Sequence, residues 1–158
     1  MNIFHLGFSP IESAQAHCDK HVVKMRTEYC QILSTVARLN GIESDTLYKA
    51  THKNHPCVIW ANQSRQNYEY LLEMTMELLL KYTYRYGKVH ASSRLIPELI
   101  DCSYKIPLGK NTLTPFVAVL PGRILHENAV THYRELYNNE KAHMVKWTRR
   151  RQPKWIKS

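Results

Sequence analysis

The feature that most restricts the fold of this chain is a long apolar repeat of helical period near its N-terminus. One apolar residue follows another every three or four positions, at Ala14, Cys18, Val22, Met25, Tyr29, Ile32 and Val36. This spacing places the side chains on one face of an α-helix. Ser9 can cap the start, with Pro10 in the first turn and Glu12 completing a capping box. Gly41 can supply the left-handed residue that ends it, so the pattern predicts one helix over about residues 10–39.

A second long helix is predicted between Pro56, a favoured first helical residue, and Gly87. Its helical spacing is marked by Val58, Ile59, Asn62, Gln66, Tyr70, Met74 and Leu78. A helix of about 30 residues is long for a globular protein, and the pattern allows a bend within it.

The rest of the chain is predicted to be less regular. Residues 102–122 contain Pro107, Pro115 and Pro121 and indicate an irregular connection. A last helix is expected over about 127–147, followed by a basic, aromatic tail over 149–158. Because no strand pattern is strong, we expect a mainly α fold, with residues 1–158 forming a single compact helical domain.

The charge of the chain indicates its kind of partner. The formal net charge is +9 at pH 7, and the positive residues are clustered, which favours a nucleic acid. No apolar run approaches the roughly 20 residues of a membrane span, so we expect no membrane partner. The four cysteines are scattered without a CxxC pair. They indicate free thiols, and we expect a monomer in a reducing cytoplasm.

A polar stripe accompanies the first predicted helix. On a continuous helix His17, His21, Lys24 and Glu28 would share one face, at the edge of the apolar side. The histidines could be ordinary core-edge side chains, or His17 and His21 could bind a metal with Glu28. Lys24 would repel a dication, and the zinc pattern with Glu directly after the first His is absent. We therefore expect neither a metal nor a cofactor, and interpret Glu28 as an acid/base group.

Three further clusters are candidates for phosphate or base contacts. "THKNHP" contributes His52 and His55 before a helix N-terminus, where local capping is the alternative. "YTYRYGKVH" mixes aromatic and basic residues, as base stacking and phosphate contact require, although some of its tyrosines must lie in the core. The tail could simply be solvated, but Trp155 within it and Trp147 just before it favour a nucleic acid. The candidates in these two last clusters are Arg85, Lys88, His90, Arg149, Arg150, Arg151 and Trp155.

The segment "DKHVVKMRTE" resembles the first helix of the small phage pyrimidine-dimer DNA glycosylases of the endonuclease V type. That family has Asp-x-His followed by a catalytic Glu seven residues after the His, and these positions are Asp19, His21 and Glu28 here. The likeness extends to a second long helix, which begins at Pro56 and ends in Arg-x-Gly at residues 85–87. It also includes the aromatic and basic C-terminus.

The resemblance implies base excision. In the family an N-terminal α-amine attacks C1′ of the damaged nucleotide to form a Schiff base, and the Glu assists ring opening and strand cleavage. An α-amine pKa of roughly 7.7–8.0 leaves a useful fraction of free base near neutrality. The family exposes a Thr amine after removal of Met, whereas a bulky Asn2 normally leaves Met1 in place. The nucleophile would then be Met1 or Lys24.

The resemblance leaves the target base open. Thr27 and Gln31 replace the arginines that flank the family's Glu, so recognition of a dimer or of another modified base is equally compatible. We expect a DNA glycosylase, with AP-lyase activity as an option, that acts on double-stranded DNA. We expect a cytoplasmic location, with a phage-infected bacterium as one option.

In this interpretation His21 orients Glu28 by a hydrogen bond, Lys24 keeps it ionised or contacts the substrate phosphate, and His17 extends the positive rim. Two other classes fit the sequence. One is a metal-dependent nuclease or phosphohydrolase that uses the histidines at positions 17, 21, 52 and 55. The other is a phage nucleic-acid-binding protein without catalysis.

Overall fold

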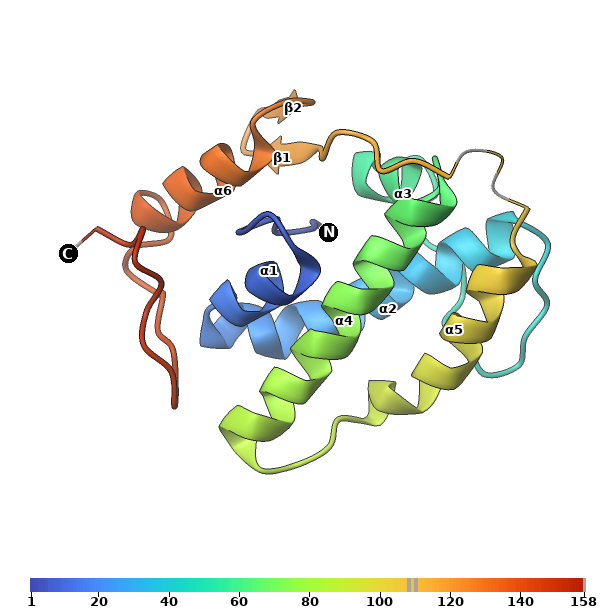
Figure 1. The fold of residues 1–158 in the computed structure, drawn as a ribbon, viewed down its shortest axis with the longest axis horizontal. Coiled ribbons are helices and arrows are strands. Elements are labelled where there is room, and N and C mark those ends of the chain that lie inside the picture. Colours follow the sequence, from blue (N-terminus) through green and yellow to red (C-terminus); the bar gives the residue numbers. More distant parts are fainter. Residues whose placement is uncertain (108, 110, 158) are drawn as a thin grey trace.

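Figure 1 shows the chain in a computed structural model, which describes residues 1–107, 109 and 111–157. Helices dominate these residues, and one antiparallel hairpin is the sheet found among them. The elements are α1 (Pro10–Ala16), α2 (Asp19–Leu39), α3 (Pro56–Ala61), α4 (Arg65–Tyr86), the 3-10 helix η1 (Ala91–Leu95), α5 (Ile96–Lys105), β1 (Ala118–Leu120), β2 (Arg123–Leu125) and α6 (Ala129–Asn138). The predicted mainly α fold is confirmed.

The first predicted helix is two helices, so its continuity was predicted wrongly. His17 (ψ 128°) and Cys18 (ψ 163°) are extended and separate α1 from α2. The predicted start is confirmed, because the Ser9 hydroxyl accepts a hydrogen bond from the Glu12 N–H (3.1 Å). The Glu12 carboxylate accepts from Phe8 N–H (3.1 Å), one residue before the position that a capping box uses.

Side chains distant in sequence stabilise this break. Arg85 donates to the carbonyl oxygens of His17 (2.9 Å) and Gln15 (3.2 Å). The indole of Trp147 donates to the Ala16 carbonyl (2.9 Å). These carbonyls belong to the end of α1, where a helix leaves its last acceptors free. Hydrogen bonds from distant residues therefore stabilise a break between α1 and α2 that the apolar repeat does not predict.

The second predicted helix is likewise divided. α3 begins at Pro56 as predicted but ends at Ala61, and α4 begins after Ser64, whose hydroxyl accepts from the Asn67 N–H (3.0 Å). The predicted glycine stops are confirmed: Gly41 (φ 87°) follows α2 and Gly87 (φ 70°) caps α4. A serine N-cap inside the pattern thus starts a new helix where we had expected at most a bend.

The C-terminal third contains more regular structure than predicted. Part of the 102–122 stretch completes α5, and another part forms β1, in which Val119 lies opposite Ile124 of β2. Gly122 (φ 73°) lies in the turn between the strands, next to Pro121. The prolines restrict the connection, but they do not prevent a short hairpin whose turn suits Pro-Gly.

The predicted last helix is too long, and the tail is ordered. α6 covers only Ala129–Asn138, and the chain then folds back. The N–H of Asp19 donates to the carbonyl of Lys146 (2.8 Å), and Trp155 lies against Tyr137 (ring centroids 5.8 Å apart). The aromatic residues of the tail are therefore part of the folded structure.

The N-terminal segment lies between two parts of the molecule. α2 and α4 pack against each other, and α1 packs against α4. Figure 1 shows residues near the N-terminus between these helices and the arm formed by β1, β2 and α6. The four cysteines are free and buried, which agrees with the predicted thiols. Among the described residues, no helix has the length and apolar character needed to cross a membrane.

Candidate active site

A cleft of about 550 Å³ lies where the N-terminal segment meets the arm. One side, called the α2 wall below, consists of Met1, Asn2, Phe4, His21, Lys24, Met25 and Glu28. The other side, called the C-terminal wall, consists of Val119, Leu120, Pro121, Leu136, Glu140, Lys141, His143 and Met144. The cleft thus joins residues from both ends of the chain.

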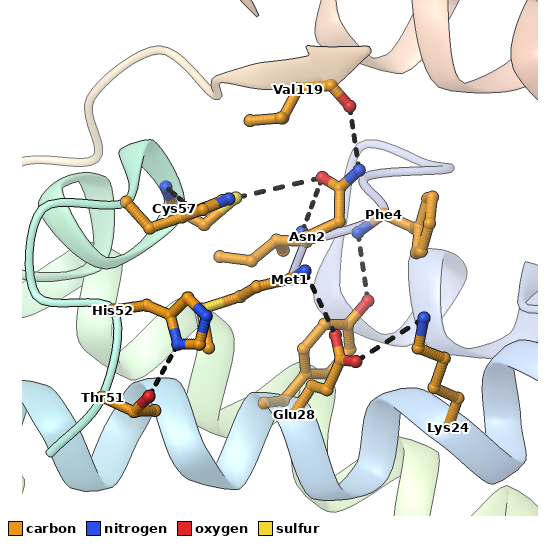
Figure 2. A network of polar contacts seen from close by, with 12 residues as sticks. Met1, Asn2, Phe4, Lys24, Glu28, Thr51, His52, Cys57 and Val119 are labelled. Carbon is orange, nitrogen blue, oxygen red and sulfur yellow. Dashed lines mark hydrogen bonds and ion pairs between the residues drawn. The ribbon is translucent and has the colours of Figure 1, made fainter. Parts of the chain in front are cut away.

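The Glu28 carboxylate lies between two amines in this cleft (Figure 2). Its Oε2 is 4.0 Å from the α-amine nitrogen of Met1, and its Oε1 is 3.7 Å from Lys24 Nζ. Lys24 and Glu28 are one helical turn apart on α2, which puts both on the same face. The Glu28 side chain is 20 % exposed. Its Oε2 is buried and has no hydrogen-bond donor among the described residues, so this oxygen is free to accept a hydrogen bond.

His17 does not lie in the cleft, and its predicted place on the polar stripe is wrong. It is fully buried, with Nδ1 2.6 Å from the Ser13 carbonyl and Nε2 2.6 Å from the Tyr29 hydroxyl. Burial, with a smaller effect of Arg85, lowers the pKa of His17 to about 4, so the ring is neutral at pH 7. Because a carbonyl only accepts, Nδ1 donates and Nε2 accepts from Tyr29.

This buried chain reaches the N-terminal segment. The Tyr29 hydroxyl also accepts from the Phe4 N–H (3.0 Å). Phe4 is 5 % exposed, and its ring stacks on His21 with centroids 4.1 Å apart. His17 therefore supports the residues that precede α1 and is not available for a phosphate.

His21 lines the cleft, but it does not orient Glu28 as predicted. Its Nδ1 is 2.6 Å from the hydroxyl of Tyr137, on α6. Burial is the main cause that lowers the pKa of His21 to about 3, and His17 and Lys141 lower it further. His21 is thus a neutral ring that connects α2 to α6.

The predicted alternative of a metal pair has little geometric support. His17 is outside α2, and both of its nitrogens have protein partners. The described residues contain no group of three or more His, Cys, Asp or Glu side chains arranged to hold a metal ion.

The Asp of the Asp-x-His motif and the Arg of Arg-x-Gly form one ion pair. Asp19 Oδ1 accepts from Arg85 Nη1 (3.0 Å), and the Arg85 side chain has no exposed surface. Asp19 also accepts from the N–H (2.9 Å) and the hydroxyl (2.6 Å) of Thr148. The prediction that Arg85 lies on a DNA-facing surface is wrong, because this buried guanidinium joins α4 to α1 and α2, and Asp19 continues the link to Thr148.

His52 and His55 lie near the amine–carboxylate pair, although neither lines the cleft. Figure 2 places His52 next to Met1, in a left-handed backbone conformation (φ 49°) that is uncommon for a residue other than glycine. His55 caps α3 by accepting from the Cys57 N–H (3.1 Å), which agrees with the local capping interpretation. Burial lowers the pKa of His55, the N-terminal ammonium and His52 lower it further, and Glu28 raises it. Both histidines therefore remain candidates for substrate contact.

The remaining basic candidates lie outside the cleft. Arg149 donates to the carbonyl of Tyr84 (3.3 Å) and lies over its ring, so the tail meets the end of α4. Arg150 donates to the Gln15 side chain (3.1 Å), and Trp155 lies under Arg134 (5.2 Å). Lys88 and Arg151 are exposed, and His90 caps η1. None of these residues lines the cleft, so their predicted DNA contacts would have to lie beside the site.

Sequence reasoning missed the C-terminal wall and Asn2. Lys141, His143 and Met144 were assigned to the last predicted helix, yet they follow α6 in an irregular segment. The segment 140–146 is rich in basic and ionisable residues, which was the one signal that could have drawn attention to it. Nothing local indicated that it would face Glu28.

The cleft has an α-amine and a carboxylate as reactive groups, in a chain of strongly basic charge. An unprotonated α-amine is a nucleophile, and a basic chain favours a polyanionic partner. The family model described as pyrimidine dimer DNA glycosylase matches residues 1–94. The chain belongs to this family. No curated protein and no solved structure matches it in the corresponding comparisons.

The family match agrees with the suspected resemblance and has a clear boundary. It includes α1 to α4 and with them the whole α2 wall. It ends before the C-terminal wall begins.

Proposed function

We propose that this protein excises a pyrimidine dimer or another modified base from double-stranded DNA, as a monomer, with Met1 as the nucleophile. The observation that carries this proposal is the 4.0 Å separation between the Met1 α-amine and Glu28 Oε2 in an open cleft. The family membership supports DNA as the substrate. The cleft is far too small for a duplex, so the target nucleotide would have to leave the stack to reach the amine.

The proposed reaction begins with the neutral amine. The Met1 nitrogen attacks C1′, and the bond from C1′ to the base breaks with its electron pair on the base, which takes a proton from water. One of the two amine protons then passes to O4′ as the C1′–O4′ bond breaks, and an iminium with one N–H proton remains. Glu28 is suited to carry that proton, because its Oε2 faces the amine and has no other donor among the described residues.

Strand cleavage would follow from the same intermediate. The iminium acidifies the proton at C2′, and loss of this proton expels the 3′ phosphate by β-elimination. The base for this step is Glu28 or one of the neighbouring histidines at positions 52 and 55. Lyase activity is thus the expected second activity of the cleft.

The experiment is reductive trapping with borohydride on a duplex that carries one pyrimidine dimer, and on one that carries an abasic site. Borohydride reduces the iminium to a stable secondary amine, so enzyme and DNA become covalently joined. We expect the adduct with the parent protein, and peptide mass spectrometry should locate it on Met1. Activity should persist in EDTA, whereas full dependence on a metal would favour a nuclease instead.

Two variants distinguish the candidate nucleophiles. Insertion of Gly before Met1 moves the amine by one residue and should abolish the adduct, while Lys24→Met should retain it. The reverse result would assign the nucleophile to Lys24. Base release without any adduct would leave a glycosylase that does not use an amine, and DNA binding without base release would indicate a binding protein.

A further inference from the structure

The side chain of Asn2 is bound from several parts of the chain. Its Nδ2 donates to the carbonyl of Val119 in β1 (2.9 Å), and its Oδ1 accepts from the N–H of Ile3 (2.9 Å). The hydroxyl of Tyr133, in α6, donates to the same Oδ1. The Cys57 thiol, in α3, lies 3.9 Å from it. Figure 2 shows this amide between the hairpin and the Met1–Glu28 pair.

The donors and acceptors define how the Asn2 amide is oriented. Tyr133 is fully buried, and burial raises the pKa of its phenol, so the hydroxyl keeps its proton. That hydroxyl accepts from the Val119 N–H (2.9 Å), and Asn2 Oδ1 is a closer acceptor for its proton than the Val117 carbonyl (3.4 Å). The amide nitrogen then faces the Val119 carbonyl, which only accepts. In the reversed orientation the amide oxygen would face the Val119 carbonyl, which is also an acceptor, and the amide nitrogen would face the Ile3 N–H, which is also a donor.

These bonds constrain the amine of the preceding residue. The first residues of a chain are usually mobile, because they lack partners. Here the Met1 side chain is only 5 % exposed, Asn2 is bound by its side chain, and Ile3 is fully buried. Little freedom remains for the Met1 nitrogen apart from rotation next to its own Cα. A nucleophile gains rate when it is kept near its attack position.

We infer that Asn2 is the positioning residue of the Met1 amine and that it ties this amine to the C-terminal wall. The inference rests on the proposed function. It also requires Met1 to remain on the chain. After loss of Met1 the amine would sit on Asn2, about 3.8 Å along the backbone, next to a side chain bound to Val119 and away from Glu28. The bulky residue at position 2, which normally prevents this loss, is thus the residue that positions the amine.

The test compares Asn2→Leu and Asn2→Asp with the parent protein. Both variants have a bulky second residue, and intact mass should verify that Met1 remains. Asn2→Leu cannot make the hydrogen bonds, so we expect borohydride trapping at saturating DNA to slow by about 10- to 100-fold. The Kd for DNA should be unchanged. Asn2→Asp keeps the acceptor for Tyr133 and adds a negative charge near the amine. Its trapping should shift to higher pH and recover there.

The matched control is Asn40→Leu. Asn40 donates to the carbonyl of Val36 (2.8 Å) and to Asn62 Oδ1 (2.7 Å) at the end of α2, and it does not line the cleft. If borohydride trapping slowed equally in Asn40→Leu and Asn2→Leu, Asn2 would contribute only to the stability of the fold, and the inference would be overturned. Parental trapping in Asn2→Leu would overturn it as well.

A second readout does not depend on activity. The ¹³C-methyl NMR signal of Met1 should be that of an ordered side chain in the parent and of a mobile one in Asn2→Leu, while Asn40→Leu leaves it unchanged. If the parent forms no adduct but Asn2→Leu mobilises Met1, the proposed function fails and the positioning stands. If Met1 is equally mobile in both proteins, the positioning itself is wrong.

Discussion

The two walls of the cleft are built in different ways. The α2 wall lies mainly on a 21-residue helix whose opposite side is buried in the core. The C-terminal wall consists of a three-residue strand and its turn, the end of a ten-residue helix, and the irregular segment after Asn139. The family match covers the first wall completely and the second not at all. A rigid helix with a definite register suits groups that must meet with precision, as Lys24 and Glu28 do.

The walls also differ in chemistry. The α2 wall has the carboxylate–amine pair, backed by buried neutral histidines. The C-terminal wall combines apolar Leu120 and Leu136 with Lys141 and His143. We therefore expect changes in the α2 wall to affect turnover, and changes in the C-terminal wall to affect DNA affinity.

The largest effect is expected from Glu28→Gln. The substitution is nearly isosteric and removes only the acid/base function, so turnover on dimer-containing DNA should fall by about 10²–10⁴-fold. Folding and Kd should change little. The control is Glu140→Gln, which alters an exposed carboxylate of the C-terminal wall and should retain parental turnover. Equal losses in both variants would contradict the assignment of chemistry to one wall.

The next effect concerns the ion pair of Arg85 with Asp19, which lies outside the cleft. Arg85→Met would leave Asp19 without its buried partner and the α1 carbonyls without a donor. Breaking such a pair costs about 3–5 kcal/mol, which should lower the Tm by about 6–20 °C. Thermal unfolding followed by circular dichroism measures this. Lys105→Met, which removes one partner of the exposed Asp101 pair, should change the Tm by a degree or two at most.

A pH titration tests the buried histidines behind the α2 wall. Burial lowers the pKa of His17 to about 4 and that of His21 to about 3, whereas the unfolded chain has ordinary values near 6.5. Between these values the unfolded state binds more protons, so stability falls as the pH falls below about 6.5. From pH 7 to pH 5 each histidine should cost about 2 kcal/mol of unfolding free energy. Urea unfolding at both pH values measures it, and stability that is flat over this range would contradict the buried neutral rings.

The smallest effect is expected in the C-terminal wall. About five phosphate contacts should give a slope of −4 to −5 when the logarithm of the DNA association constant is plotted against the logarithm of the salt concentration. Lys141→Gln should make this slope less steep by about one. Turnover at saturating DNA should be retained. Arg151→Gln, in the exposed part of the tail, should reduce the slope similarly if the tail also contacts phosphates. A Lys141 variant that loses turnover at unchanged affinity would contradict the division between the walls.

The local features of this protein could be predicted from its sequence. Ser9, Gly41, Pro56 and Gly87 marked helix ends correctly, because capping depends on residues only a few positions apart. Helical spacing also predicted that Lys24 lies next to Glu28, because residues four positions apart are neighbours on one face of a helix. The mainly α fold followed from periodicity, and the free thiols followed from the spacing of the cysteines.

The site itself was decided by the tertiary structure. The break between α1 and α2 is stabilised by Arg85 and Trp147, which are far away in sequence, and it moved His17 from the predicted stripe into the core. Asn2 meets Val119 across 117 positions, and His21 meets Tyr137 across 116. A sequence pattern reports which face of an element is apolar, but not which distant element covers it. The sequence therefore determined which residue carries the carboxylate and that Lys24 lies beside it, and only the folded chain brought the Met1 amine to its other oxygen.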